Sequence, residues 1–160
     1  MITIQKASEK DLDLILEFIK KLADYENLSS SVVATKELLK ENLFIKQKAY
    51  VLIAYYDLKP VGFALYFNNF STFLGKCGIY LEDLFVDVEY RNKGIGKALI
   101  KELAKIANQN DYERIDWVCL KDNYPSLKVY KKIGANTKDE WLLHRLEKSD
   151  INNLLNNKIN

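Results

Sequence analysis

The 160-residue sequence is poor in the residues that define metal-binding and disulfide-rich proteins. It contains two cysteines, one histidine and two prolines. Cys77 and Cys119 stand far apart and form no Cys-x-x-Cys pair, so we expect two ordinary thiols rather than a disulfide or a zinc site. His144 has no cluster of potential ligands around it in the sequence, so we expect a structural or surface role. No metal is expected.

Long apolar runs and an excess of one charge are also missing. No run reaches the length of a transmembrane helix, and the N-terminus lacks a signal-peptide core, so we expect no membrane contact and a cytoplasmic location. The 24 basic and 22 acidic residues give a net charge of +2, which offers no electrostatic case for a nucleic-acid partner. The length predicts one domain over residues 1–160, with a sizeable core.

Glycine is scarce too, with six residues, but two of them fall in one short loop. Residues 79–86 are apolar and aromatic, as in a buried strand. The following loop, residues 91–97, contains Gly94 and Gly96 with three cations and leads into an amphipathic helix. A strand, a glycine loop and a helix N-terminus form an anion site, because free backbone N–H groups and the helix dipole point the same way.

Two common phosphate-binding patterns fit this loop poorly. A Walker A loop needs Gly at position 91 and Ser or Thr after Lys97, but the chain has Arg91 and Ala98 there. A dinucleotide fingerprint needs a third small residue at position 99, which is leucine, and a turn tight against the strand. The pattern that does fit is Arg-x-x-Gly-x-Gly between a strand and a helix.

The rest of the chain predicts alternating strands and helices from hydrophobic periodicity, capping residues and turn residues. The predicted strands are 2–5, 49–56, 61–68, 79–86, 114–120 and 141–146. The predicted helices are 8–25, 35–42, 95–107, 127–133 and 149–157. Three successive strands with short links indicate an antiparallel meander. The fold class is therefore α/β (α+β), with a mixed, mostly antiparallel sheet flanked by helices.

This order and the glycine loop resemble the GCN5-related N-acetyltransferase (GNAT) family over nearly the whole chain. Within it, the closest resemblance is to the diamine (spermidine/spermine) N-acetyltransferases. The segments that carry it are Leu22–Glu26, Val61–Ala64, Tyr80–Asp83, Arg91–Lys97, Asn123–Ser126 and Tyr130–Ala135. The resemblance implies an acetyl-CoA-dependent N-acetyltransferase in which a primary amine attacks directly in a ternary complex. It also implies a homodimer, paired through the apolar segment 141–146.

The resemblance assigns the cofactor to backbone groups of one strand and two loops. These cofactor-binding residues are Leu84, Phe85, Val86, Arg91, Asn92, Lys93, Gly94, Ile95, Gly96, Lys97, Asn123, Pro125 and Ser126.

The same resemblance names two catalytic residues. Glu82 matches the residue that binds the amine and helps to remove its proton, and Tyr130 matches the tyrosine that donates a proton to the leaving thiolate. Taken alone, a carboxylate on a strand can simply face solvent, and a helical tyrosine is more often core.

A pocket for a small cationic amine should be acidic, with aromatic rings against its methylenes. The candidate substrate-binding residues are Tyr25, Glu26, Phe73, Glu82, Asp83, Asp116 and Trp117. The animal diamine enzymes carry an acid and a tryptophan where this chain has Ser71 and Phe73, and a cation where it has Ile133. A short diamine or a lysine-like amine therefore stands beside a long polyamine as the predicted substrate.

Two other functions stay open. An acetyltransferase of protein lysines or N-termini would use the same acidic cluster for a basic peptide. A regulatory module that binds acyl-CoA without turnover would need neither Glu82 nor Tyr130.

Overall fold

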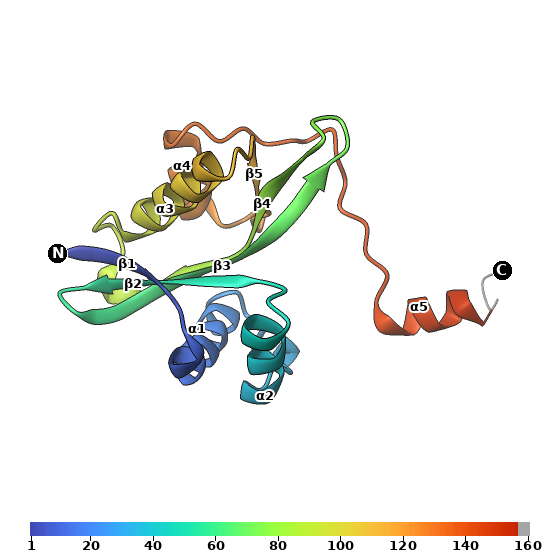
Figure 1. Ribbon diagram of the computed structural model, residues 1–160, viewed down its shortest axis with the longest axis horizontal. Coiled ribbons are helices and arrows are strands. Elements are labelled where there is room, and N and C mark those ends of the chain that lie inside the picture. The colour runs from blue at the N-terminus through green and yellow to red at the C-terminus, as the bar shows by residue number, and fades with distance from the viewer. Residues whose placement is uncertain (157–160) are drawn as a thin grey trace. The chain divides into compact units, whose positions relative to one another are not determined.

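The computed structural model describes residues 1–156, which fall into two compact units, Met1–Leu120 and the residues from Lys121 onward. The first unit contains one five-stranded sheet in the order β1-β2-β3-β4-β5 (Figure 1). Its strands are β1 (Ile2–Lys6), β2 (Tyr50–Tyr56), β3 (Lys59–Ser71), β4 (Lys76–Val86) and β5 (Ile115–Asp116). Strands β1 to β4 pair antiparallel and β5 pairs parallel to β4, which confirms the predicted mixed sheet.

Helices cover both faces of this sheet (Figure 1). On one face lies α1 (Leu12–Tyr25), together with the single turn α2 (Lys36–Leu39) and the wider turn Lys40–Ile45 that continues it. The other face carries α3 (Ile95–Gln109). Helix α1 ends at the predicted residue but begins four residues later than predicted, after the 3-10 turn Glu9–Asp11. Helix α3 begins as predicted and ends two residues later. Both have a strong apolar face, which explains why they were recognisable.

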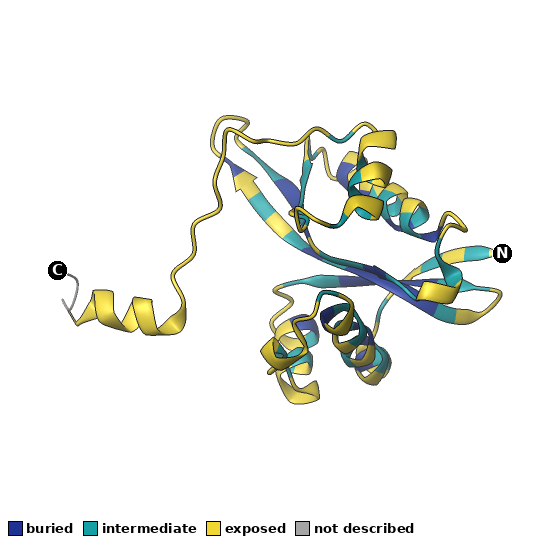
Figure 2. Cartoon of the chain, turned by 180° about the vertical axis from the view of Figure 1, so that it is seen from behind, coloured by how far each residue is buried: buried dark blue, intermediate teal, exposed yellow. Residues whose placement is uncertain are grey.

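Two apolar cores fill the spaces between the sheet and its helices. Alternate residues of β2 divide between them, since Leu52 and Ala54 pack with α3 whereas Val51 and Ile53 pack with α1. This alternation is the period of two expected for a strand covered on both faces. Figure 2 shows the buried residues following the middle of the sheet and the inner sides of these helices.

The second unit contains α4 (Tyr124–Lys132) and α5 (Lys148–Leu155). Helix α4 starts three residues earlier than predicted, because Asn123 caps it and Pro125 fits its first turn. The predicted end of α5 at Asn157 lies outside the described residues.

Two strand predictions at the C-terminal side were wrong. The strand predicted over residues 114–120 forms only at Ile115–Asp116, since β4 and β5 pair over two residue positions and no further. Residues 141–146 form no strand: within residues 1–156 no strand pairs with them, and they are exposed (Figure 2). Apolar character cannot make a strand without a neighbour that takes its backbone hydrogen bonds. Among the described residues, no helix combines the length and apolar character needed to cross a membrane.

Candidate active site

The centre of the candidate site is a β-bulge in β4. Leu65 of β3 pairs with Asp83, but the next residue, Tyr66, pairs with Leu81. Glu82 is therefore the extra residue on β4, with no residue opposite it on β3. A bulge of this kind bends the strand and changes the direction of its side chains.

The bulge reverses which side chains of β4 face each core. Before it, Ile79 and Leu81 belong to the core that α3 covers. After it, Leu84 and Val86 pack on that same core, and Phe85 belongs to the core under α1. Odd-numbered residues thus point toward α3 before the bulge and toward α1 after it.

Asp83 lies in this second part of β4 and is mostly withdrawn from water. Burial, and after it the negative charges of Glu82 and Glu26, together raise the pKa of its carboxyl to about 6. Glu26 is the residue that ends α1, and burial raises its own pKa as well. Three predicted substrate residues therefore form one acidic cluster, which a cation would stabilise.

One edge of β4 is open beside this cluster. Strand β5 reaches β4 only at Ile79 and Tyr80. From Leu81 to Val86, β4 pairs with β3 on one side, and no strand among residues 1–156 pairs with it on the other. The carbonyl of Val86 accepts a hydrogen bond from Arg91, and the edge otherwise has the form to which an extended ligand can pair.

The glycine loop follows directly and ends at the first turn of α3. Gly94 is the N-cap residue in a left-handed conformation (φ +84°), and Asn92 is also left-handed (φ +61°). A side-chain carbon placed on Gly94 would meet nothing within 4 Å, so the space beside this residue is open. These features fit a loop that holds a pyrophosphate through backbone N–H groups.

The cations of the loop differ in their surroundings. Lys93 and Lys97 are exposed, and the Lys93 ammonium lies 4.8 Å from the ring centroid of Tyr90 and 5.1 Å from that of Tyr56. Arg91 is half-buried, and its Nε donates a hydrogen bond to the backbone carbonyl of Val86 (3.0 Å).

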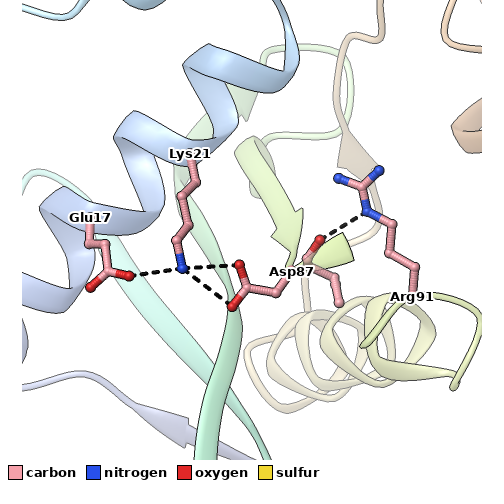
Figure 3. A network of polar contacts seen from close by, with 5 residues as sticks. Glu17, Lys21, Asp87 and Arg91 are labelled. Atoms are coloured by element: carbon pink, nitrogen blue, oxygen red, sulfur yellow. Dashed lines mark hydrogen bonds and ion pairs between the residues drawn. The ribbon is translucent and has the colours of Figure 1, made fainter. Parts of the chain in front are cut away.

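Sequence reasoning missed the contacts that join this loop to α1. The Arg91 guanidinium lies 4.2 Å from the ring centroid of Tyr25. Lys21 of α1 pairs with Glu17 (2.8 Å) and with Asp87 at the end of β4 (3.1 Å), as Figure 3 shows. These bonds raise the pKa of Lys21, with the Glu17 hydrogen bond contributing most. The spacing of Glu17 and Lys21 signals a helical ion pair, but nothing in the sequence points to Asp87.

The other predicted substrate residues of the first unit lie in different surroundings. Asp116 binds Arg114 (3.0 Å) and accepts a hydrogen bond from Asn69 (3.0 Å). Trp117 packs against the core under α3. Phe73 is 99% exposed at the tip of the β3–β4 hairpin. Ser71, the other position at which this loop differs from the diamine enzymes, is buried.

The remaining predicted residues belong to the second unit. Tyr130 is half-buried in α4. At the start of this helix the Asn123 side chain accepts a hydrogen bond from the backbone N–H of Ser126 (3.4 Å), with Pro125 between them. The predicted roles of these residues stay predictions. Over residues 1–156, no group of three or more His, Cys, Asp or Glu side chains is placed to hold a metal ion.

Comparison with known proteins gives the family. The model of the acetyltransferase (GNAT) family matches residues 17–135. A thialysine N-epsilon-acetyltransferase of Bos taurus is 34% identical over 158 residues, covering 91% of this chain and 92% of that protein.

Solved structures agree. An integron cassette protein from the mobile metagenome of V. cholerae is 31% identical with a TM-score of 0.80, over 96% of this chain and 97% of that one. A predicted acetyltransferase from Clostridium acetobutylicum, solved with acetyl-CoA, is 25% identical with a TM-score of 0.75, over 91% of this chain and 97% of that one. The chain therefore belongs to the GNAT family and is an N-acetyltransferase.

Proposed function

We propose that this N-acetyltransferase moves the acetyl group of acetyl-CoA to a primary amine of a small diamine, polyamine or lysine-like molecule. The observation that carries the proposal is the acidic cluster of Glu26, Glu82 and Asp83 beside the open edge of β4. A substrate with more than one ammonium group neutralises such a cluster better than a monoamine does. The Bos taurus enzyme that resembles this chain is named for thialysine, which is a lysine-like amine.

The proposed cofactor site uses the open edge of β4 and the glycine loop. Leu84, Phe85 and Val86 offer backbone groups to an extended thioester arm, and the loop from Asn92 to Lys97 offers N–H groups to a pyrophosphate. Acetyl-CoA supplies an acetyl group activated as a thioester.

Each proposed catalytic residue moves one proton. A primary ammonium must lose a proton before it can attack, and Glu82 accepts that proton, directly or through water. As the new C–N bond forms and the C–S bond breaks, the sulfur takes a proton, which Tyr130 donates. The nitrogen loses its second proton as it becomes an amide, and this proton restores the Tyr130 hydroxyl through solvent. Asp83 and Glu26 hold the remaining positive charge of the substrate.

We also propose that the whole chain works as one acetyltransferase domain and as a cytoplasmic homodimer. The family match over residues 17–135 crosses the border between the two compact units. The apolar side chains of Trp141, Leu142 and Leu143 are exposed, which suits a contact with a second copy. Light scattering at micromolar concentration tests this, and a monomer mass would contradict it.

A protein lysine or N-terminus is the alternative acceptor, because a basic peptide also suits an acidic cluster. One competition experiment separates the two. The enzyme is incubated with acetyl-CoA and an equimolar mixture of putrescine, spermidine, thialysine and a lysine-rich peptide. Mass spectrometry then identifies the acetylated products. We expect acetylation of the small amines. Acetylation of the peptide alone would replace the proposed substrate class.

A further inference from the structure

Arg91 is held between the sheet and the end of α1. Its Nε binds the carbonyl of Val86 at 3.0 Å, which places the guanidinium at the end of β4. The same guanidinium carbon lies 4.2 Å from the ring centroid of Tyr25 and 5.9 Å from that of Phe85. A planar guanidinium at such distances binds aromatic rings by cation–π attraction, and partial burial strengthens it.

A second contact joins the same two segments. Lys21 lies one helical turn before Tyr25 and pairs with Asp87, which directly follows β4 (Figure 3). Glu17, one turn earlier still, holds the Lys21 ammonium from the other side. The C-terminal half of α1 is thus attached at two points to the segment that begins the glycine loop.

This end of α1 also carries part of the acidic cluster. Glu26 follows Tyr25 directly, and its negative charge acts on Asp83. Because Tyr25 and Glu26 are adjacent in the chain, a contact that fixes Tyr25 also restrains the backbone that carries Glu26.

We propose that Arg91 is a positioning residue for the amine, acting through Tyr25 on Glu26, in addition to any charge it offers to the cofactor. The glycine loop and the amine site are then coupled, because Arg91, which starts the loop, also fixes the position of Glu26 in the amine site. The inference rests on the proposed function and concerns the same site.

The test compares substitutions that change this contact in different ways. Arg91→Lys keeps the positive charge near the loop but loses the flat group that stacks on Tyr25. Tyr25→Leu removes the ring and leaves the loop unchanged, while Tyr25→Phe keeps the ring face. Lys6→Gln is the matched control, because it removes another cation–π contact, with Tyr50 (5.6 Å), that lies outside both proposed sites.

Steady-state kinetics with a diamine at saturating acetyl-CoA, and calorimetric titration with CoA, provide the readouts. We expect Arg91→Lys and Tyr25→Leu each to raise the amine KM by about 5-fold, the change that the loss of one partly buried cation–π contact would cause. The double variant should be no worse than either single one, because both remove the same contact. Lys6→Gln should keep the wild-type amine KM. Tyr25→Phe should raise the amine KM less than Tyr25→Leu does, because it keeps the ring that contacts Arg91. Tyr25→Leu should keep the wild-type Kd for CoA.

Two results would overturn the inference. If the Arg91→Lys enzyme binds CoA more weakly but keeps the wild-type amine KM, Arg91 acts only on cofactor binding. Fully additive effects in the double variant mean that Tyr25 and Arg91 act separately. Failure of the proposed function looks different, since the wild-type enzyme itself would then turn over no amine, and the inference would fall with it.

Discussion

Asp83 of β4 stands opposite Leu65 of β3, although a regular strand would place Glu82 there. This one-residue shift carries Asp83 to the face of the sheet that α1 covers, where Glu26 ends the helix. The acidic cluster is therefore a product of the bulge. A uniform strand would separate Asp83 from Glu26 by the thickness of the sheet.

The raised pKa of Asp83 predicts a dependence of stability on pH. Its folded-state pKa of about 6 lies above that of an unfolded aspartate, because of burial and then of the charges of Glu82 and Glu26. The stability that this group contributes is fully present below its unfolded pKa of about 4 and is lost as pH rises through about 6. The asparagine of the Asp83→Asn variant cannot ionise. The free energy of unfolding of this variant minus that of wild type should therefore increase by about 1–3 kcal/mol from pH 4 to pH 7.

Urea denaturation at pH 4, 5, 6 and 7 measures this difference. Asp139→Asn, at an exposed position of the second unit, is the matched control and should show no such change. A constant difference between Asp83→Asn and wild type across this range would mean that Asp83 ionises as freely as an exposed aspartate.

Glu82→Gln tests the proposed base. The amide cannot accept a proton, so we expect kcat/KM for a diamine at pH 7 to fall by about 100-fold. Activity of the variant should recover as pH rises, since more of the substrate amine is then already neutral. Rates from pH 6 to 9 give the profile. A variant profile parallel to that of wild type would remove Glu82 from the role of base.

Tyr130→Phe tests the proposed acid. Loss of the hydroxyl should lower kcat by about 100-fold, while the Kd for CoA stays within about 2-fold of wild type. Tyr124→Phe, at a tyrosine that is 72% exposed on the same helix, is the control for general effects on α4. Near-normal turnover in Tyr130→Phe would show that another group, or water, supplies the proton.

Gly94→Ala tests the glycine loop. Gly94 and Gly75 both have left-handed φ angles, +84° and +64°, and both have open space around them. Alanine at either position should cost about 1 kcal/mol of stability through backbone strain. Only Gly94→Ala should weaken CoA binding, because Gly75 lies on the distant β3–β4 hairpin. Calorimetric Kd values that rise equally in both variants would argue against a loop-specific effect.

Gly62→Ala tests the close approach of β3 and β4. A side-chain carbon at Gly62 would lie 2.5 Å from the carbonyl oxygen of Phe85 and 3.1 Å from the Cα of Val86. The two strands must separate to admit it, so we expect the free energy of unfolding to fall by about 1–3 kcal/mol. Thermal unfolding measures the change, with Gly96→Ala as a comparison, since its nearest contact is at 4.0 Å. An unchanged Tm for Gly62→Ala would contradict this packing.

Sequence patterns predicted the elements whose signals are local. The capping box at Ser8 precedes a 3-10 turn, Glu9–Asp11, and α1 follows it at Leu12, four residues after the predicted start. Helix α3 begins at the predicted residue, directly after the glycine loop, and ends two residues later than predicted. The strand around Tyr80 was evident from its apolar run. The family resemblance named Glu82 and Asp83, but their different surroundings depend on the bulge, which leaves no pattern in the chain.

Features that depend on pairing between distant segments could not be predicted. Arg114 to Leu120 reads as a strand, yet β5 ends at Asp116, because strand length is set by the neighbour as well as by composition. The ion pair of Lys21 with Asp87 joins residues 66 positions apart. Nothing in either local sequence marks the other as its partner.

Thiol release from acetyl-CoA by the wild-type enzyme, across an amine panel, tests the central claim most directly. The panel contains putrescine, spermidine, spermine, lysine, thialysine and the monoamine n-butylamine. We predict rapid release with amines that carry a second positive charge and slow release with n-butylamine, because Glu26, Glu82 and Asp83 form one acidic site. The proposed function would be contradicted if n-butylamine reacted as fast as the doubly charged amines, or if no amine of the panel caused thiol release.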